Sequence, residues 1–162
     1  MQSPQLLAEG FRYHAAMMER LIDLAAQLPE GQYRAPTRFG RSLHALFVHV
    51  LRVDIVWRSL STAPGFAPPP MEEPANPAAL RLAFEREAAA VQAHLEELDA
   101  VAIGTQLAAR SPRGDMHQLA RWRMLLQRFL HGQQHRAEIA QILSEYGHSP
   151  GDLDFIFFEV IP

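Results

Sequence analysis

Cysteine is absent from the 162 residues of the sequence. Disulfide bonds, cysteine-based zinc fingers, iron–sulfur clusters and cysteine nucleophiles are therefore excluded. A reaction that needed a thiol would have to take it from an external molecule.

Basic residues are not in excess, and long apolar runs are missing. The formal net charge is −3 at pH 7, which argues against nonspecific nucleic-acid binding because that requires a basic surface. No apolar run approaches the roughly 20 residues of a membrane-spanning helix, and the first residues lack the apolar segment of a secretory signal. We therefore expect neither nucleic acid nor membrane as a partner, and a cytoplasmic location.

The residues that are present predict one helical domain. A chain with 48% hydrophobic and 20% charged residues fits a single globular domain over residues 1–162. Apolar side chains recur at helical spacing in four long segments. These segments run from about Pro4 to Leu28, Arg41 to Leu60, Asn76 to Leu98 and Ala120 to Tyr146. The sequence thus predicts an all-α fold with four long helices.

Proline and glycine mark the connections between these segments. Pro29-Glu30-Gly31 ends the first helix, and residues 32–40 form a connection. Residues 61–77 hold six of the twelve prolines and form a stiff loop. Two interpretations are open before the last helix. Either residues 105–109 and 116–119 pair as a small β-hairpin around a turn at residues 111–114, or Asp115 caps a helix.

The last helix is apolar on two sides. One side carries Trp122, Leu126, Phe129, Ala137 and Ala140, and the other carries Met124, His131, His135, Ile139, Ile142 and Tyr146. One side therefore faces the bundle, and the other faces a partner subunit or the C-terminal tail. The tail from Asp152 onward is too apolar to stay free, so we expect it to pack against the domain. We also expect a homodimer through this helix, since symmetric dimers are the commonest oligomers.

Two histidines one helical turn apart, His131 and His135, are the first candidates for a metal site. Residues four apart share a helix face, so both imidazoles can point at one ion such as zinc, nickel or iron. On spacing alone, two surface or hydrogen-bonded histidines are the more common case. Gly132 stands where a zinc protease has its glutamate, so that class is excluded. Another part of the chain must supply a further ligand.

Three other histidines lie in the first two helical segments. His49 shares a broad apolar face and so points into the interior. The other members of that face are Leu46, Val50, Val53, Val56, Trp57 and Leu60. His44 is turned about 140° from His49 on a helix of 3.6 residues per turn, so the two cannot face one centre. His14 lies in the apolar stripe of the first helix, where a core or ligand-supporting role is favoured over direct ligation.

Several motifs in order connect this sequence to a known family. They are FRYH at residues 11–14, SLHALFVHVLRVDIVW at 42–57, WRMLLQRFLHGQQHRAEI at 122–139, Gly147 with Pro150, and DLDFI at 152–156. Together they cover nearly the whole chain. The sequence resembles the DinB family, within the superfamily that includes the YfiT-like metal proteins.

The resemblance implies an up-down-down-up four-helix bundle with a long connection between the second and third helices. It also implies a divalent metal, zinc or nickel, held by His49, His131 and His135. Family members are often dimers. Some relatives are transferases or isomerases that use a low-molecular-weight thiol, and many have no known activity.

These implications leave two classes of function open. The first is a metal-dependent enzyme, an S-transferase, isomerase or hydrolase, that activates a metal-bound thiol or water for a small-molecule substrate. The second is a non-catalytic dimeric bundle with a structural metal and a stress-related binding role. A vacant coordination position that opens onto a pocket would favour the enzyme.

One departure from the family pattern concerns Glu138. The family often reads HHRGQ where this chain has QHRAE from Gln134 to Glu138. His135 and Arg136 are kept, and Glu138 stands where glutamine is usual. Glu138 either orients a ligand histidine or forms a surface ion pair. It and His14 are the candidates for a general base, and no catalytic residue is assigned.

Overall fold

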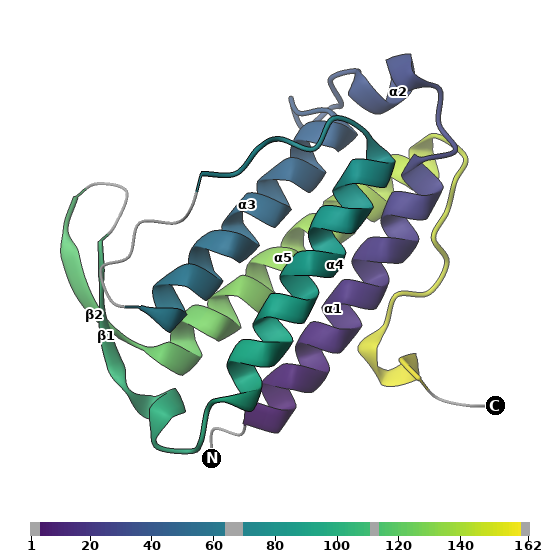
Figure 1. Ribbon diagram of the computed structural model, residues 1–162. Helices are drawn as coiled ribbons and strands as arrows, with labels where there is room; N and C mark the ends of the chain where they lie inside the picture. Colours follow the sequence, from purple (N-terminus) through teal and green to yellow (C-terminus); the bar gives the residue numbers. More distant parts are fainter. Residues whose placement is uncertain (1–3, 64–69, 111–113, 160–162) are drawn as a thin grey trace.

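Four long helices packed side by side form the body of the computed structural model, which describes residues 4–63, 70–110 and 114–159 (Figure 1). They are α1 (Pro4–Ala25), α3 (Leu43–Thr62), α4 (Pro77–Glu96) and α5 (Arg121–Glu145). A short helix, α2 (Glu30–Arg34), and two 3₁₀ turns, η1 (Ala102–Gly104) and η2 (Phe155–Phe157), lie in the connections. None of the helices in these described ranges combines the length and apolar character needed to cross a membrane.

Contacts between the helices establish their directions. Phe11, near the start of α1, packs with Leu95 at the end of α4 and with Leu125 near the start of α5. Helix α1 is therefore antiparallel to α4 and parallel to α5. Arg58 of α3 contacts Glu87 of α4. Ser61, further along α3, contacts His94, further along α4, so these two helices are parallel. The result is the expected up-down-down-up bundle.

Helices α3 and α4 begin with side-chain caps, close to the starts predicted at about Arg41 and at Asn76. The Ser42 side chain accepts a hydrogen bond from the amide of Ala45 at 3.1 Å, and Asn76 does the same for Ala79 at 2.9 Å. Each cap satisfies one of the amides that a helix N-terminus leaves without a partner. The first helix ends at Ala25, three residues earlier than predicted.

Helix α2 is a correction to the sequence-based prediction. Glu30–Arg34 is helical, although Pro29-Glu30-Gly31 was expected only to end the preceding helix and residues 32–40 to be a connection. Pro29 stands just before the first turn, a position that proline tolerates. The helix buries Tyr33, which is 3% exposed, so burial of one aromatic ring stabilises a segment that local pattern leaves irregular.

The β-hairpin is confirmed, and the alternative of a helix capped by Asp115 is wrong. Strands β1 (Gln106–Arg110) and β2 (Met116–Ala120) pair antiparallel, with Gln106 opposite Ala120. Residues 111–113 of the expected turn, and residues 64–69 of the expected proline-rich loop, lie outside the described part of the chain. Leu107 and Ala109 pack on Met124 with Trp57 and Leu60, so the hairpin covers one end of α3 and α5.

The buried face of α3 differs from the predicted one. Its most buried positions, at 0–1% exposure, are Leu43, Leu46, Phe47, Val50, Leu51, Asp54 and Ser61. Val53 and Val56 are only half-buried, and His49 lies at the edge of the buried face. The predicted face included Val53 and Val56 and left out Asp54, because a pattern of apolar residues does not include a buried charged one.

Helix α5 also shows a different division of faces from the predicted one. Its core face includes Leu125, Arg128, Gly132, Arg136 and Ile139, whereas Ala137 of the expected apolar side is exposed. Two of these core positions are arginines, and a pattern of apolar residues cannot identify them.

The C-terminal tail packs on α1 in part, as expected. The Tyr13 hydroxyl donates to the carbonyl of Leu153, and the Tyr13 ring meets Phe155 and Phe158 edge-on at centroid distances of 5.3 and 5.6 Å. Phe155, Ile156 and Phe157 nevertheless stay 46%, 72% and 62% exposed. Part of the tail's apolar surface is therefore left uncovered.

Candidate metal centre

Three histidines from two antiparallel helices converge on one point. His49 comes from α3, and His131 and His135 come from successive turns of α5. The Nε2 atom of His131 lies 3.1 Å from that of His49 and 3.1 Å from that of His135. One nitrogen from each ring lies within 4.8 Å of the other two. Two nitrogens bound tetrahedrally at 2.0–2.1 Å to zinc are separated by about 3.3 Å, so the group matches such a site.

Glu138 determines which nitrogen of His135 is available. The Nδ1 atom of His135 donates to the Glu138 carboxylate at 2.7 Å. A hydrogen on Nδ1 leaves the lone pair on Nε2, which faces His131. Of the two roles left open by the sequence, orientation of a histidine is the one that this geometry supports.

The other two rings are held in the neutral form that a metal ligand needs. Burial, reinforced by the charges of His135 and His49, lowers the pKa of His131 to about 4. Burial and the charge of His135 also lower the pKa of His49. Both imidazoles are therefore unprotonated near neutral pH, with lone pairs free to bind a cation.

The site is reached from solvent on one side. His49 and His131 are half-buried, and His135 is 7% exposed. Three nitrogen ligands leave at least one position of a tetrahedral or larger coordination shell unfilled by these histidines. A molecule from solvent would meet the group on the side where His49 and His131 are partly exposed.

His44 does not belong to this group, as predicted. It is only 5% exposed and lies under α2, where its Nδ1 contacts the Tyr33 hydroxyl at 3.1 Å. Its Nε2 lies 3.2 Å from a carboxylate oxygen of Glu73 in the connection before α4. The sequence placed His44 away from His49 but could not show that it links α3 to these two segments.

His14 is a core residue and not a member of the histidine group. Its Nδ1 accepts a hydrogen bond from Arg136, and its Nε2 donates to Asp54 at 3.0 Å. Burial lowers the pKa of His14 despite the opposing charge of Asp54. The structure therefore places His14 in the core, one of the two roles expected for it, and among the described residues gives it no hydrogen bond to the three converging rings.

The order of the sequence motifs, the helix directions and the three converging histidines all agree with the family resemblance. A family model described as the DinB family matches residues 1–161. The chain belongs to the DinB family. No curated protein matches it.

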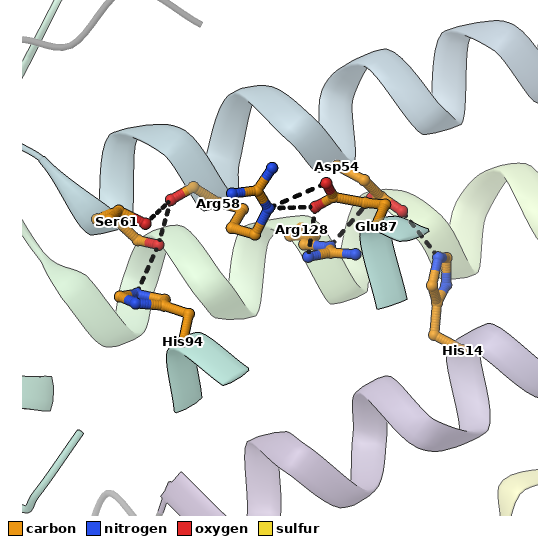
Figure 2. A network of polar contacts seen from close by, with 8 residues as sticks. His14, Asp54, Arg58, Ser61, Glu87, His94 and Arg128 are labelled. Carbon is orange, nitrogen blue, oxygen red and sulfur yellow. Dashed lines mark hydrogen bonds and ion pairs between the residues drawn. The ribbon is translucent and has the colours of Figure 1, made fainter. Parts of the chain in front are cut away.

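A buried network of charges crosses the core of this DinB protein (Figure 2). Glu87 of α4 accepts from Arg58 at 2.9 Å and lies 3.1 Å from Arg128 of α5. Asp54 lies between Arg128 and His14, with contacts of 3.4 and 3.0 Å. Burial opposes ionisation of Asp54, but Arg128 and His14 outweigh it and lower its pKa.

Sequence reasoning missed this network. Asp54, Glu87 and Arg128 are each at most 4% exposed, although residues of these types are mostly found at the surface. One signal was present: Asp54 interrupts an apolar run from Val53 to Val56. A charged residue inside such a run indicates a buried partner, but the sequence does not identify the partner.

A cavity of about 430 Å³ lies on another side of the DinB bundle, between α1, α5 and the tail. Its lining includes Tyr13, Phe129, Gln133 and Leu153, and none of the three converging histidines contributes to it. The cavity and the histidine group are therefore separate features of the molecule.

Proposed function

We propose that this DinB protein binds a divalent metal ion, zinc or nickel, through the Nε2 atoms of His49, His131 and His135. The observation that carries the proposal is the convergence of three ring nitrogens, in which His131 Nε2 lies 3.1 Å from Nε2 of both His49 and His135. Lone pairs that meet in this way repel one another unless a hydrogen or a cation lies between them. Imidazole nitrogen suits both zinc and nickel, so the donor set does not separate the two.

The partly exposed side of the site is where a substrate molecule would bind. An ion held by three imidazoles lowers the pKa of a water or thiol that takes the remaining position and so makes it a better nucleophile. The thiol would be an external low-molecular-weight compound because the chain has no cysteine. We therefore propose thiol-dependent transfer or isomerisation, or hydrolysis, as the reaction class.

The chain's own residues have defined roles in this proposal. His49, His131 and His135 bind the ion, and Glu138 keeps the lone pair of His135 on Nε2 through its 2.7 Å hydrogen bond. Glu138 is thus a positioning residue. Its carboxylate is committed to His135, which argues against its earlier candidacy as a general base.

Metal analysis of the purified protein tests the binding proposal. The protein is stripped with a strong chelator, reloaded with zinc or nickel, dialysed and measured for metal per chain. One tightly held ion per chain is expected. If neither metal is retained above the level of the triple variant His49→Ala, His131→Ala and His135→Ala, the proposal is wrong.

A second assay tests the proposed reaction class. The metal-loaded protein is incubated with a panel of low-molecular-weight thiols and electrophiles, and with hydrolysable esters and amides. Turnover that requires both metal and His49 supports an enzyme. Full metal occupancy without turnover in any arm would favour the alternative below.

The alternative is a non-catalytic bundle in which the metal is structural and the protein has a stress-related binding role. One observation favours it: the cavity of about 430 Å³ between α1, α5 and the tail is not lined by the three histidines. A structural ion would raise the thermal midpoint of unfolding strongly without any turnover, because it binds only the folded state.

A further inference from the structure

We propose that Asp54 orients His131 as Glu138 orients His135, so that each of the two α5 histidines has its own carboxylate. The inference rests on the proposed metal site and assigns a positioning role to a residue of α3 that the sequence placed on no functional face. It concerns the nitrogen of His131 that points away from the other two rings.

Metal binding determines which nitrogen of His131 carries the hydrogen. When Nε2 of a neutral imidazole binds a metal, the hydrogen must be on Nδ1. The Nδ1 atom of His131 is buried and has no hydrogen-bond partner among the residues that the structure describes. A buried N–H without an acceptor is unfavourable, and metal-bound histidines almost always donate this hydrogen to a carboxylate, a carbonyl or water.

Asp54 offers a buried acceptor for the hydrogen of His131. Asp54 is 0% exposed, and its Oδ1 atom, like Nδ1 of His131, has no hydrogen-bond partner in the described part of the chain. Its nearest cation contact is the Arg128 Nε at 3.4 Å, beyond the usual range for an N–H···O bond. Nε and Nη1 of Arg128 lack a hydrogen bond as well, but each has a carboxylate oxygen within 3.4 Å, whereas His131 Nδ1 has no partner among the described residues.

Asp54 lies against the part of α5 that carries His131. Asp54 Oδ1 lies 3.4 Å from Arg128, which precedes His131 by three residues and so shares its side of α5. Asp54 Oδ2 bonds His14, whose ring lies against Gly132, the residue after His131. Glu138 already accepts from His135. Asp54 is therefore the remaining carboxylate that can take the hydrogen of His131 Nδ1, directly or across one buried water.

Side chains from two other helices keep Asp54 in place. His14 donates to its Oδ2 at 3.0 Å, and Arg128 supports its charge from α5 (Figure 2). Arg136 donates to the opposite nitrogen of His14, which requires the hydrogen of His14 to be on the nitrogen that faces Asp54. Residues of α1 and α5 thus hold the carboxylate of Asp54 on α3, and its Oδ1 atom can still accept a hydrogen bond.

The experiment compares zinc affinity among isosteric variants by competition with a chromophoric chelator. Asp54→Asn removes the proposed acceptor charge. Glu87→Gln is the matched control, because Glu87 is a buried carboxylate of the same network that binds Arg58 and Arg128. Glu138→Gln is the positive reference. Asp54→Asn and Glu138→Gln should each weaken zinc binding by about 10- to 100-fold. Glu87→Gln should destabilise the fold, but under conditions where every variant is folded it should weaken zinc binding less than Asp54→Asn does.

A spectroscopic readout separates orientation from general stability. Nitrogen-resolved NMR of the histidine rings in the zinc-loaded wild type should show His131 bound through Nε2 and carrying a slowly exchanging Nδ1–H. That signal should move or exchange faster in Asp54→Asn. The wild-type spectrum decides the matter even if Asp54→Asn does not fold, because ligation through Nδ1, or a rapidly exchanging Nδ1–H, would overturn the proposal.

The outcomes distinguish this inference from the metal site itself. If zinc binds wild type tightly but Asp54→Asn and Glu87→Gln weaken it equally, Asp54 has only a structural role and the assignment is wrong. If wild type retains no zinc, the metal site fails and the role of Asp54 fails with it.

Discussion

His131 and His49 remain neutral because of where they lie, and this determines how the site responds to acid. A free imidazole has a pKa of about 6.5, so an ordinary histidine site loses its metal between about pH 6 and 5. Burial and neighbouring rings lower the pKa of His131 to about 4 and also lower that of His49. Protons therefore compete with the ion at these two nitrogens only at lower pH.

We predict that zinc is retained at about pH 5.5 and is lost as the pH falls toward about 4. Zinc per chain after equilibrium dialysis across a series of pH values is the measurement. Release that is already complete at about pH 6 would show that the lowered pKa values do not govern binding.

Gly132 is a second residue whose role is local and geometric. A Cβ atom at this position would lie 2.5 Å from Cε1 and 2.7 Å from Nδ1 of His14. His14 cannot move aside easily, since Asp54 and Arg136 hold it from both sides. Glycine at this buried helical position thus lets the His14 ring lie against α5.

Gly132→Ala should lower the free energy of unfolding by about 1–3 kcal/mol, the usual cost of overpacking. Gly31→Ala is the control, because a Cβ there meets nothing within 4 Å and alanine favours the helix by up to about 1 kcal/mol. Urea unfolding of the metal-free proteins measures both. Equal stability of Gly132→Ala and wild type would mean that His14 is not fixed as described.

At the scale of the elements, buried charges connect α3, α4 and α5 in the core. Glu87 connects α4 to Arg58 of α3 and to Arg128 of α5. Removing one partner of a buried ion network leaves an uncompensated charge and costs about 3–5 kcal/mol. Glu87→Gln should therefore be among the most destabilising single changes in the bundle.

The exposed ion pair between Asp23 and Arg81 is the control for that prediction, since the two side chains are 57% and 38% exposed. Asp23→Asn should change the free energy of unfolding by less than about 1 kcal/mol. Thermal or denaturant unfolding of both variants compares the two. A similar small effect for Glu87→Gln would show that its network contributes little to holding the helices together.

The elements also show where sequence reasoning succeeds. Ser42 and Asn76 are local signals, so the starts of α3 and α4 could be predicted from a few neighbouring residues. The hairpin was one of two alternatives, and the packing of Leu107 on Met124 favours it in the folded chain. Helix α2 was missed because it depends on burial of Tyr33 against His44, a contact with another segment.

The candidate site divides in the same way. The pairing of His131 with His135 follows from helix geometry, and the place of His49 beside them was implied by the family resemblance. Asp54 and Arg128 could not be predicted, because apolar patterns assign charged residues to the surface. Their burial depends on partners from other helices, and a single sequence does not show which residues those are.

At the scale of the whole molecule, apolar surface on α5 and the tail remains without a cover. Leu130 of α5 is 54% exposed, and the tail residues Ile156 and Phe157 are more so. We propose that a second copy of the chain covers the outer face of α5 in a symmetric homodimer, as such exposed apolar surface commonly marks an interface.

Light scattering at micromolar concentration should therefore give the mass of a dimer. Leu130→Glu should shift the protein toward monomer by placing a charge in the interface. Leu82→Glu on α4 is the matched control, because Leu82 is 53% exposed and lies on a different helix. A monomeric mass for wild type would contradict the proposal.

The central claim is that His49, and not His44, completes the metal site with His131 and His135, and metal per chain after dialysis against a weak chelator tests it most directly. His49→Ala, His131→Ala and His135→Ala should each lose most of the metal, because each removes one of three converging nitrogens. His44→Ala should retain it, since His44 bonds only to Tyr33 and Glu73 among the described contacts of its side chain. Full metal in His49→Ala together with loss in His44→Ala would contradict the account.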